Sequence, residues 1–171
     1  MALALSNADY DSARLYAVVR AILGSTELCA MATLADDGAA HINTAYFAFD
    51  DELRLYFLSN PASLHCRNIA RRPGMAVAAF DTHQPWGAPG KGLQLFGTGA
   101  VAAGGAADRA RTVYGARFPL FGEFSRSPDA PSAGPSFRVL RLYEFTPDRL
   151  KILDEEHLGD EANVVAEIRR H

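Results

Sequence analysis

The stretch Leu53–Pro73 reads LRLYFLSNPASLHCRNIARRP and decides the fold, because it joins a strand pattern directly to a helix pattern. Its first residues alternate, with Leu53, Leu55 and Phe57 on one side and Arg54, Tyr56 and Leu58 on the other. Asn60 suits a helix N-cap, and Pro61 suits the first helical position, where a missing N–H costs nothing. The two arginines before Pro73 are typical of a helix end. We therefore predict a strand to Ser59 and a helix beginning at Pro61.

Three polar side chains, Ser59, Ser63 and His65, fall where this predicted helix begins. Helix N-termini carry unpaired N–H groups and a partial positive charge, so they bind phosphate well. Two hydroxyls and an imidazole at such a position indicate a phosphate-binding site. An ordinary capped helix is the alternative, with the serines forming local turns and His65 solvated. From the spacing alone this alternative is the commoner one, because Ser and Asn often cap helices.

Further strand patterns lie on both sides of this stretch, separated by polar turns. They are Leu28–Leu34, His41–Phe49, Met75–Phe80, Gly92–Val101, Phe137–Phe145 and a short final strand, Arg149–Leu153. The Asp36–Gly38 segment is a hairpin signal between the first two. Short strands at regular spacing predict a mainly β protein with flanking helices (α+β), built as an antiparallel barrel or sandwich.

Helical patterns are fewer and lie outside these strands. One runs from a cap at Asn7 or Asp9 to about Leu23, and another covers Asp108–Phe118. The tail Gly159–His171 is polar with one weak helical face. Pro119–Pro135 holds four prolines and has no predicted element, and it is either a lid or an arm that contacts another subunit.

Composition limits the function. The chain has 171 residues, a hydrophobic content of 49% and a net charge of −3, which predict one globular domain. Without a block of Lys or Arg, nucleic-acid binding is not expected. No apolar run approaches the roughly 20 residues of a membrane span, and no signal-peptide pattern is present, so we expect a cytoplasmic protein. No nucleophile elbow, Walker loop or zinc-protease helix is present, so any chemistry is expected to come from a cofactor.

The order Ser59, Asn60, short gap, Ser63, His65 resembles the FMN-phosphate segment of the pyridoxamine 5′-phosphate oxidase-like split β-barrels. In that family a Thr or Ser ends the strand, and a Ser-Arg-Lys-type triplet follows on the helix. Here the triplet reads Ser63, Leu64, His65, so two phosphate-binding cations of the family are replaced. Arg67 and the helix N-terminus are candidates to compensate. The resemblance covers about Glu27–Phe145 and is closest to the YhbP-like branch, whose Tyr-x-x-x-Phe-Pro helix end matches Tyr114, Phe118 and Pro119.

This resemblance implies a homodimeric, six- to seven-stranded antiparallel split β-barrel that binds FMN at the dimer interface. The chain 1–171 would form one FMN-binding domain, with an N-terminal helix in 1–26, the barrel in 27–153 and a C-terminal tail in 154–171. The implied cofactor-binding residues are Asn43, Thr44, Tyr46, Leu58, Ser59, Ser63, Leu64, His65 and Gln94. Trp86, on the Pro/Gly-rich loop Asp81–Lys91, is added as an aromatic that stacks on the cofactor or gates the substrate; it could equally anchor the loop.

The expected function is therefore that of an FMN-dependent oxidoreductase, which passes hydride or electrons between the flavin and a small-molecule substrate or electron donor. No catalytic residue and no metal site is identified. The alternative is a non-catalytic protein of the same fold that binds flavin, F420 or haem, with His41, His65 or His83 as a ligand of haem iron. A barrel that has lost its cofactor is the third hypothesis. Oxidation of pyridoxamine phosphate itself is not expected, because Arg169-Arg170-His171 lacks the spacing of the true oxidases.

Overall fold

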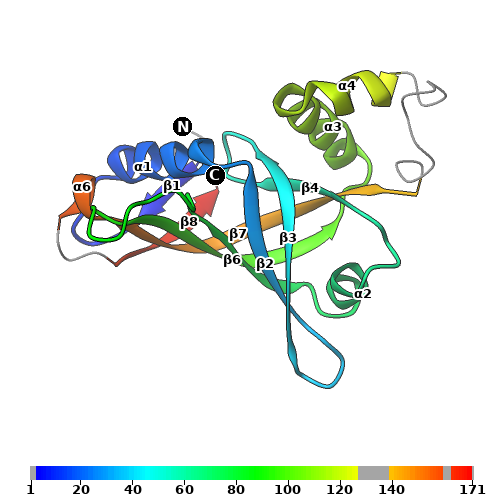
Figure 1. Ribbon diagram of the computed structural model, residues 1–171, viewed down its shortest axis with the longest axis horizontal. Helices are drawn as coiled ribbons and strands as arrows, with labels where there is room; N and C mark the ends of the chain where they lie inside the picture. Colours follow the sequence, from blue (N-terminus) through cyan, green and yellow to red (C-terminus); the bar gives the residue numbers. More distant parts are fainter. Residues whose placement is uncertain (1–2, 127–138, 160–162, 171) are drawn as a thin grey trace.

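The computed structural model describes residues 3–126, 139–159 and 163–170 (Figure 1). In chain order its elements are β1 (Leu3–Ser6), α1 (Ser12–Ser25), β2 (Leu28–Leu34), β3 (Ala40–Phe49), β4 (Leu55–Ser59), α2 (Leu64–Arg71), β5 (Gly74–Ala79), β6 (Lys91–Val101), α3 (Gly105–Arg117), α4 (Pro119–Arg126), β7 (Arg141–Asp154), α6 (Glu155–Leu158) and β8 (Val164–Arg170). No helix in these ranges has the length and apolar character needed to cross a membrane.

Within the described residues, six antiparallel strands close into a barrel. The sheet order is β1-β8-β7-β4-β3-β2-β5-β6, and β6 also pairs with β7, which closes the ring formed by β2 to β7. β8 and β1 continue the sheet beyond β7. The expected mainly β fold with flanking helices, an antiparallel split barrel, is therefore confirmed. The homodimer stays a prediction.

β7 is the strand that makes closure possible. Its first residues pair with β4, its last residues pair with β8, and most of its length pairs with β6. We expected a turn at Pro147, but the strand continues through it, because a register shift between Phe96 and Gly97 absorbs the irregularity. A Cβ on Gly97 would lie 2.2 Å from the carbonyl oxygen of Thr146, so only glycine fits this crossing.

The core fills the barrel, and helices cover three parts of its surface. The largest fully buried side chains inside include Phe47, Phe57, Phe145 and Leu95. α1 packs on β1 and β6, α2 packs on β2 and β6, and α3 packs on the outer face of β3, β4 and β7 (Figure 1). α6 lies at one end of the long axis of the molecule, and α2 lies in the opposite half (Figure 1).

Both ends of the chain differ from the sequence expectation. The segment 1–26, expected to hold a helix only, begins with β1, and α1 has Asp11 as its N-cap because Asn7 accepts the amide hydrogens of Asp9 and Tyr10 and holds a turn there. The tail, expected to have a weak helical face, forms β8, whose residues alternate between buried and exposed. Residues 119–126, expected to lack an element, form α4; 127–135 lie outside the described residues.

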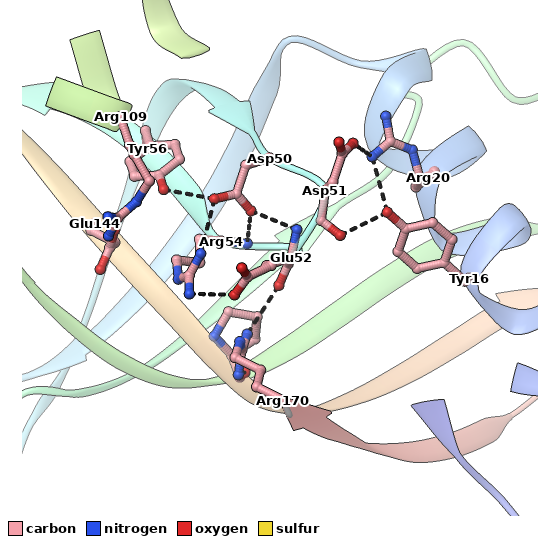
Figure 2. A network of polar contacts seen from close by, with 11 residues as sticks. Tyr16, Arg20, Asp50, Asp51, Glu52, Arg54, Tyr56, Arg109, Glu144 and Arg170 are labelled. Atoms are coloured by element: carbon pink, nitrogen blue, oxygen red, sulfur yellow. Dashed lines mark hydrogen bonds and ion pairs between the residues drawn. The ribbon is translucent and has the colours of Figure 1, made fainter. Parts of the chain in front are cut away.

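A charged network fixes the turn that leads into β4 (Figure 2). The Asp50 carboxylate accepts the backbone amides of Glu52 and Arg54 at 2.9 and 3.0 Å, and the Tyr56 hydroxyl at 2.8 Å. Arg170 donates to the carbonyl of Glu52 at 3.2 Å, which ties β8 to the same turn. The turn holds Leu53 at φ 58°, a strained value for a large side chain, so β4 begins at Leu55 and not at Leu53 as expected.

Candidate cofactor-binding site

α2 begins three residues later than the sequence indicates. The side chain of Asn60 accepts the amide hydrogen of Ala62 at 2.9 Å, and the amide of Ser63 donates to the Asn60 carbonyl at 2.9 Å. Asn60 therefore caps a turn, not the helix. Ser63 takes the N-cap position, but its side chain makes no capping hydrogen bond. The first-turn amides of α2 consequently have no side-chain partner, which favours an anion at this end.

The hydroxyls of Ser59 and Ser63 and the imidazole of His65 meet at this helix end. His65 Nε2 lies 2.6 Å from Ser59 Oγ and 3.1 Å from Ser63 Oγ, and the two hydroxyl oxygens are 3.5 Å apart. All three residues are half-buried. β4 supplies Ser59 and α2 supplies His65, so the strand-to-helix connection creates the cluster. We call Ser59, Ser63 and His65 the cradle.

The buried thiol of Cys66 adjoins the cradle. Burial raises the pKa of this thiol, but its hydrogen bonds with His65, Ser59, Ser63 and Tyr143 lower the pKa by more. As a result the pKa of Cys66 falls to about 7. The phenol of Tyr143 responds in the opposite sense, because burial and its hydrogen bond with Cys66 raise its pKa. A thiol ionised near neutral pH would place a negative charge beside any anion in the cradle.

The pairing of β4 with β7 places Arg141 beside Ser59 of the cradle. It lies directly opposite Ser59 in the β4–β7 pairing, and directly opposite residues of an antiparallel pair project on the same face. Its guanidinium donates to the carbonyl of Leu140 at 2.9 Å. Arg67, the other candidate, donates to the carbonyl of Ala62 in the turn before α2. Arg141 and Arg67 are therefore the arginines that the β4–β7 pairing and the start of α2 place next to residues of the cradle in the backbone.

The predicted residues of β3 lie on both faces of the sheet. Asn43 faces inward, and its Oδ1 atom is buried without a hydrogen-bond partner. Thr44 and Tyr46 face outward and line a groove of about 410 Å³, and the Tyr46 ring meets Phe118 edge-on at 5.8 Å. His41, on the inward face with Asn43, stacks parallel to His65 at 6.3 Å between ring centroids.

Two of the predicted phosphate-segment residues turn away from the cradle. The Leu58 side chain packs with the cluster under α3 that contains Tyr56 and Tyr114, on the face of β4 opposite to Ser59. Leu64 is 42% exposed at the start of α2. Only their backbones remain available to a ligand in the cradle.

Gln94 and Trp86 lie at the other end of the barrel, in a groove of about 520 Å³ between β6, β7 and the loop 81–91. In the register, Val101 of β6 lies opposite Tyr143, which marks the level of the cradle, and Gln94 lies seven residues before it, roughly 23 Å along the strand. Gln94 and the cradle therefore lie far apart along the strands of one chain.

Sequence reasoning missed Tyr143 and Arg141 as parts of this site. Their alternation on one strand was visible, but only the β4–β7 register shows that they face Ser59. Among the described residues, no group of three or more His, Cys, Asp or Glu side chains is placed to hold a metal ion. The cluster is suited to binding an anion through hydroxyls, imidazole and helix amides.

Comparison with known proteins gives a family. The sequence model of pyridoxamine 5′-phosphate oxidase matches residues 15–151. This match covers most of the chain and confirms the family that the Ser59–His65 segment indicated. The YhbP-like branch stays a prediction. No curated protein matches the sequence.

Solved structures share the fold at low sequence identity. A haem-binding protein from Mycobacterium smegmatis has a TM-score of 0.66 and 15% identity over 95% of this chain, which spans 60% of that protein. A protein of the pyridoxinephosphate oxidase family from Clostridium acetobutylicum, related to general stress protein 26, has a TM-score of 0.61 and 13% identity over 90% of this chain and 94% of its own. A haem storage protein from Vibrio cholerae has a TM-score of 0.59 and 15% identity over 75% of this chain and 87% of its own.

Proposed function

Because the chain belongs to the pyridoxamine 5′-phosphate oxidase family, we propose that it is an FMN-binding oxidoreductase whose cradle holds the flavin phosphate. The observation that carries the proposal is the meeting of Ser59, Ser63 and His65 at a helix N-terminus without a side-chain cap. Phosphate is an acceptor-rich dianion, and such a helix end offers donors and a positive field.

The residues present fit a phosphate, although two cations of the family are replaced. The two serine hydroxyls and His65 donate hydrogen bonds, and the first-turn amides of α2 add more. Arg141 and Arg67 supply positive charge from the side. Charge-assisted hydrogen bonds of this kind are the strong ones, so the loss of Arg and Lys from the triplet need not abolish binding.

FMN, when bound, supplies two-electron hydride chemistry that no side chain of this protein can perform. The protein would contribute position and polarity. Asn43, with its unpartnered Oδ1, is a candidate acceptor near the cradle, and Gln94 offers both a donor and an acceptor to the polar edge of a ring. We also propose that the protein is cytoplasmic. We propose further that residues 1–171 form one FMN-binding domain.

A homodimer would reconcile the two separated groups of site residues. Gln94 and Trp86 of one subunit would approach the flavin held in the cradle of the other. A surface suited to such a contact exists on the outer face of β2, β3 and β5, where large apolar side chains are exposed: Leu28 at 47%, Ile42 at 68%, Tyr46 at 55% and Phe80 at 46%. Exposed apolar patches of this kind mark interaction sites.

Haem is the second candidate cofactor, because two proteins of similar fold are described as haem-binding and haem-storing. His41 and His65 are the histidines nearest the cradle. Their rings lie face to face, and His65 Nε2 already contacts two hydroxyls. Two axial ligands of one haem instead point a ring nitrogen at the iron, so the stacked pair is not arranged as the two axial ligands of one haem.

A visible absorption spectrum of the purified protein, recorded before and after FMN is added and the excess is removed, separates these candidates. Retained flavin bands that co-elute with a dimer on gel filtration are the expected result. A Soret band would replace the proposal with haem binding. A colourless protein that leaves FMN fluorescence unchanged would contradict both.

A further inference from the structure

The groove between β6, β7 and the loop 81–91 contains the single tryptophan and both lysines of the chain. The sequence contains a single tryptophan, Trp86, and only two lysines, Lys91 and Lys151; all three line the groove of about 520 Å³ described above. Its wall also contains Gln94, which lies directly opposite Lys151 in the β6–β7 register and on the same face. One aromatic surface and two ammonium groups therefore share one concave site, away from the cradle.

The loop 81–91 presents Trp86 from a fixed base. The side-chain amide of Gln84 donates from Nε2 to the backbone carbonyls of Asp81 and Lys91 at 2.8 Å each. Its Oε1 atom accepts the backbone amide hydrogen of Lys91 at 2.6 Å. A turn closed by the amide of Ala88 and the carbonyl of Pro85 holds the tip. The Trp86 side chain is nevertheless fully exposed, so nothing in the described part of the chain covers it. An indole held out in this way is available to stack on a flat ligand.

The charges of the groove favour an anion at Lys151. Lys91 is paired with Glu156 at 2.5 Å, and Glu155 accepts the amide hydrogen of Gly90. Asp154 is buried and bonded to His157. The nearby carboxylates thus have partners, whereas Lys151 makes no ion pair within the described part of the chain. Lys151 is left as a half-buried cation beside Gln94.

We propose that this groove binds a planar aromatic carboxylate, which stacks on Trp86 and places its carboxylate between Lys151 and Gln94. The binding itself needs no flavin. The assignment of this ligand as a substrate or electron donor of the flavin rests on the proposed function, in which the same groove faces the flavin of the other subunit.

Trp86 provides its own readout, because it is the only tryptophan in the chain. Flavin-free full-length protein is titrated with nicotinate and, separately, with nicotinamide, which has the same ring but no charge. Nicotinate is expected to quench the Trp86 fluorescence with about tenfold higher affinity than nicotinamide, as a charge-assisted contact to Lys151 requires. Quenching that is absent, or equal for the two compounds, would overturn the proposal.

Substitutions of Lys151 and Trp86 separate the contribution of the charge from that of ring stacking. Lys151→Met keeps the apolar stem and is expected to abolish the preference for nicotinate, and Lys151→Arg to retain it. The matched control is Arg149→Met, which removes a cation on the same strand that lies over the Phe96 ring outside the groove. Trp86→Ala, followed by equilibrium dialysis of labelled ligand, should weaken both compounds alike. A preference that survives Lys151→Met would overturn the assignment.

A final arm distinguishes this site from the cradle. Dialysis of labelled nicotinate is repeated with the Ser63→Ala/His65→Ala variant, and unchanged binding is expected, because the groove contains neither residue. A loss of binding in this variant would overturn the groove as a site separate from the cradle. If the protein proves unable to bind FMN, the proposed function fails, but the flavin-free titration still decides the present inference.

Discussion

Two polar clusters lie at the two ends of strand β4, and they differ in whether their charges are already paired. Before the strand, Asp50 is bonded to two amides, the Tyr56 hydroxyl and the Arg54 guanidinium (Figure 2). After it, within the described residues, the side chains of Ser59, Ser63 and His65 bond to one another and to Cys66. The strand between them is five residues long.

The difference teaches how to separate a structural cluster from a binding site. The Asp50 network joins opposite charges from the turn, β7, β8 and α3, so its charged side chains are ion-paired or hydrogen-bonded, although Glu144 Oε2 and Arg170 Nε make no hydrogen bond. The cradle combines an uncapped helix end with two hydroxyls and an imidazole and contains no carboxylate, so it offers hydrogen-bond donors to an anion, with the Cys66 thiol as its acidic neighbour. A cluster of the first kind stabilises the fold, whereas a cluster of the second kind attracts an anion.

The largest expected effect on stability comes from removing the Asp50 carboxylate. Asp50→Ala would leave the buried Tyr56 hydroxyl, the Arg54 side chain and two turn amides without their acceptor. We expect the free energy of unfolding to fall by about 3 kcal/mol, measured by urea denaturation. The control is Asp51→Ala, whose side chain is 89% exposed and pairs with Arg20, and which should cost less than about 0.5 kcal/mol. Equal losses would contradict a structural role for Asp50.

An effect of intermediate size is expected when the Cys66 thiol beside the cradle titrates and changes the unfolding free energy. The pKa of Cys66 in the folded chain is lowered to about 7, below the ordinary thiol value, so folding favours the thiolate. Its stabilisation is present above the unfolded pKa and is lost as the pH falls through about 7. The unfolding free energy should therefore rise by roughly 1–2 kcal/mol between about pH 6.5 and 9, and this rise should be absent in Cys66→Ala. An unchanged profile in the variant would argue against an ionised thiol there.

The smallest expected effect concerns the cation beside the cradle. Arg141→Ala should weaken FMN binding about threefold to tenfold, and less at high salt, because Arg141 is exposed and acts through a screened charge. Arg149→Ala removes an exposed arginine of the same strand near the other end and should leave affinity unchanged. A common loss in both variants, measured by quenching of FMN fluorescence, would indicate a general charge effect and no role for the β4–β7 register.

Much of the barrel was predictable, because its strands carry a period-2 pattern. β2 has the predicted bounds, β3 and β6 begin one residue earlier than predicted, and β5 is shifted by one residue at both ends. The start of α2 was not predictable from capping rules, since Asn60 is a good cap for either a turn or a helix. β8 was visible in the alternation of Val164, Ala166 and Ile168 with polar or exposed neighbours, but its polar residues suggested a helix.

The candidate site was only partly predictable. Ser59, Ser63 and His65 lie within seven residues, so local geometry brings them together. Tyr143 and Arg141 reach the cradle only through pairing of strands about 80 residues apart, and no local pattern specifies that register. The same is true of Gln94, whose distance from the cradle depends on how β6 is placed in the closed barrel.

The measurement that tests the central claim most directly compares FMN with riboflavin, which lacks only the phosphate. If the cradle holds the phosphate, the protein should bind FMN at least about tenfold more tightly than riboflavin. Ser63→Ala/His65→Ala should remove this preference while leaving the unfolding free energy nearly unchanged, in contrast to Asp50→Ala. Equal affinities for FMN and riboflavin in the unmodified protein, or a preference that survives the double substitution, would contradict the assignment of the cradle.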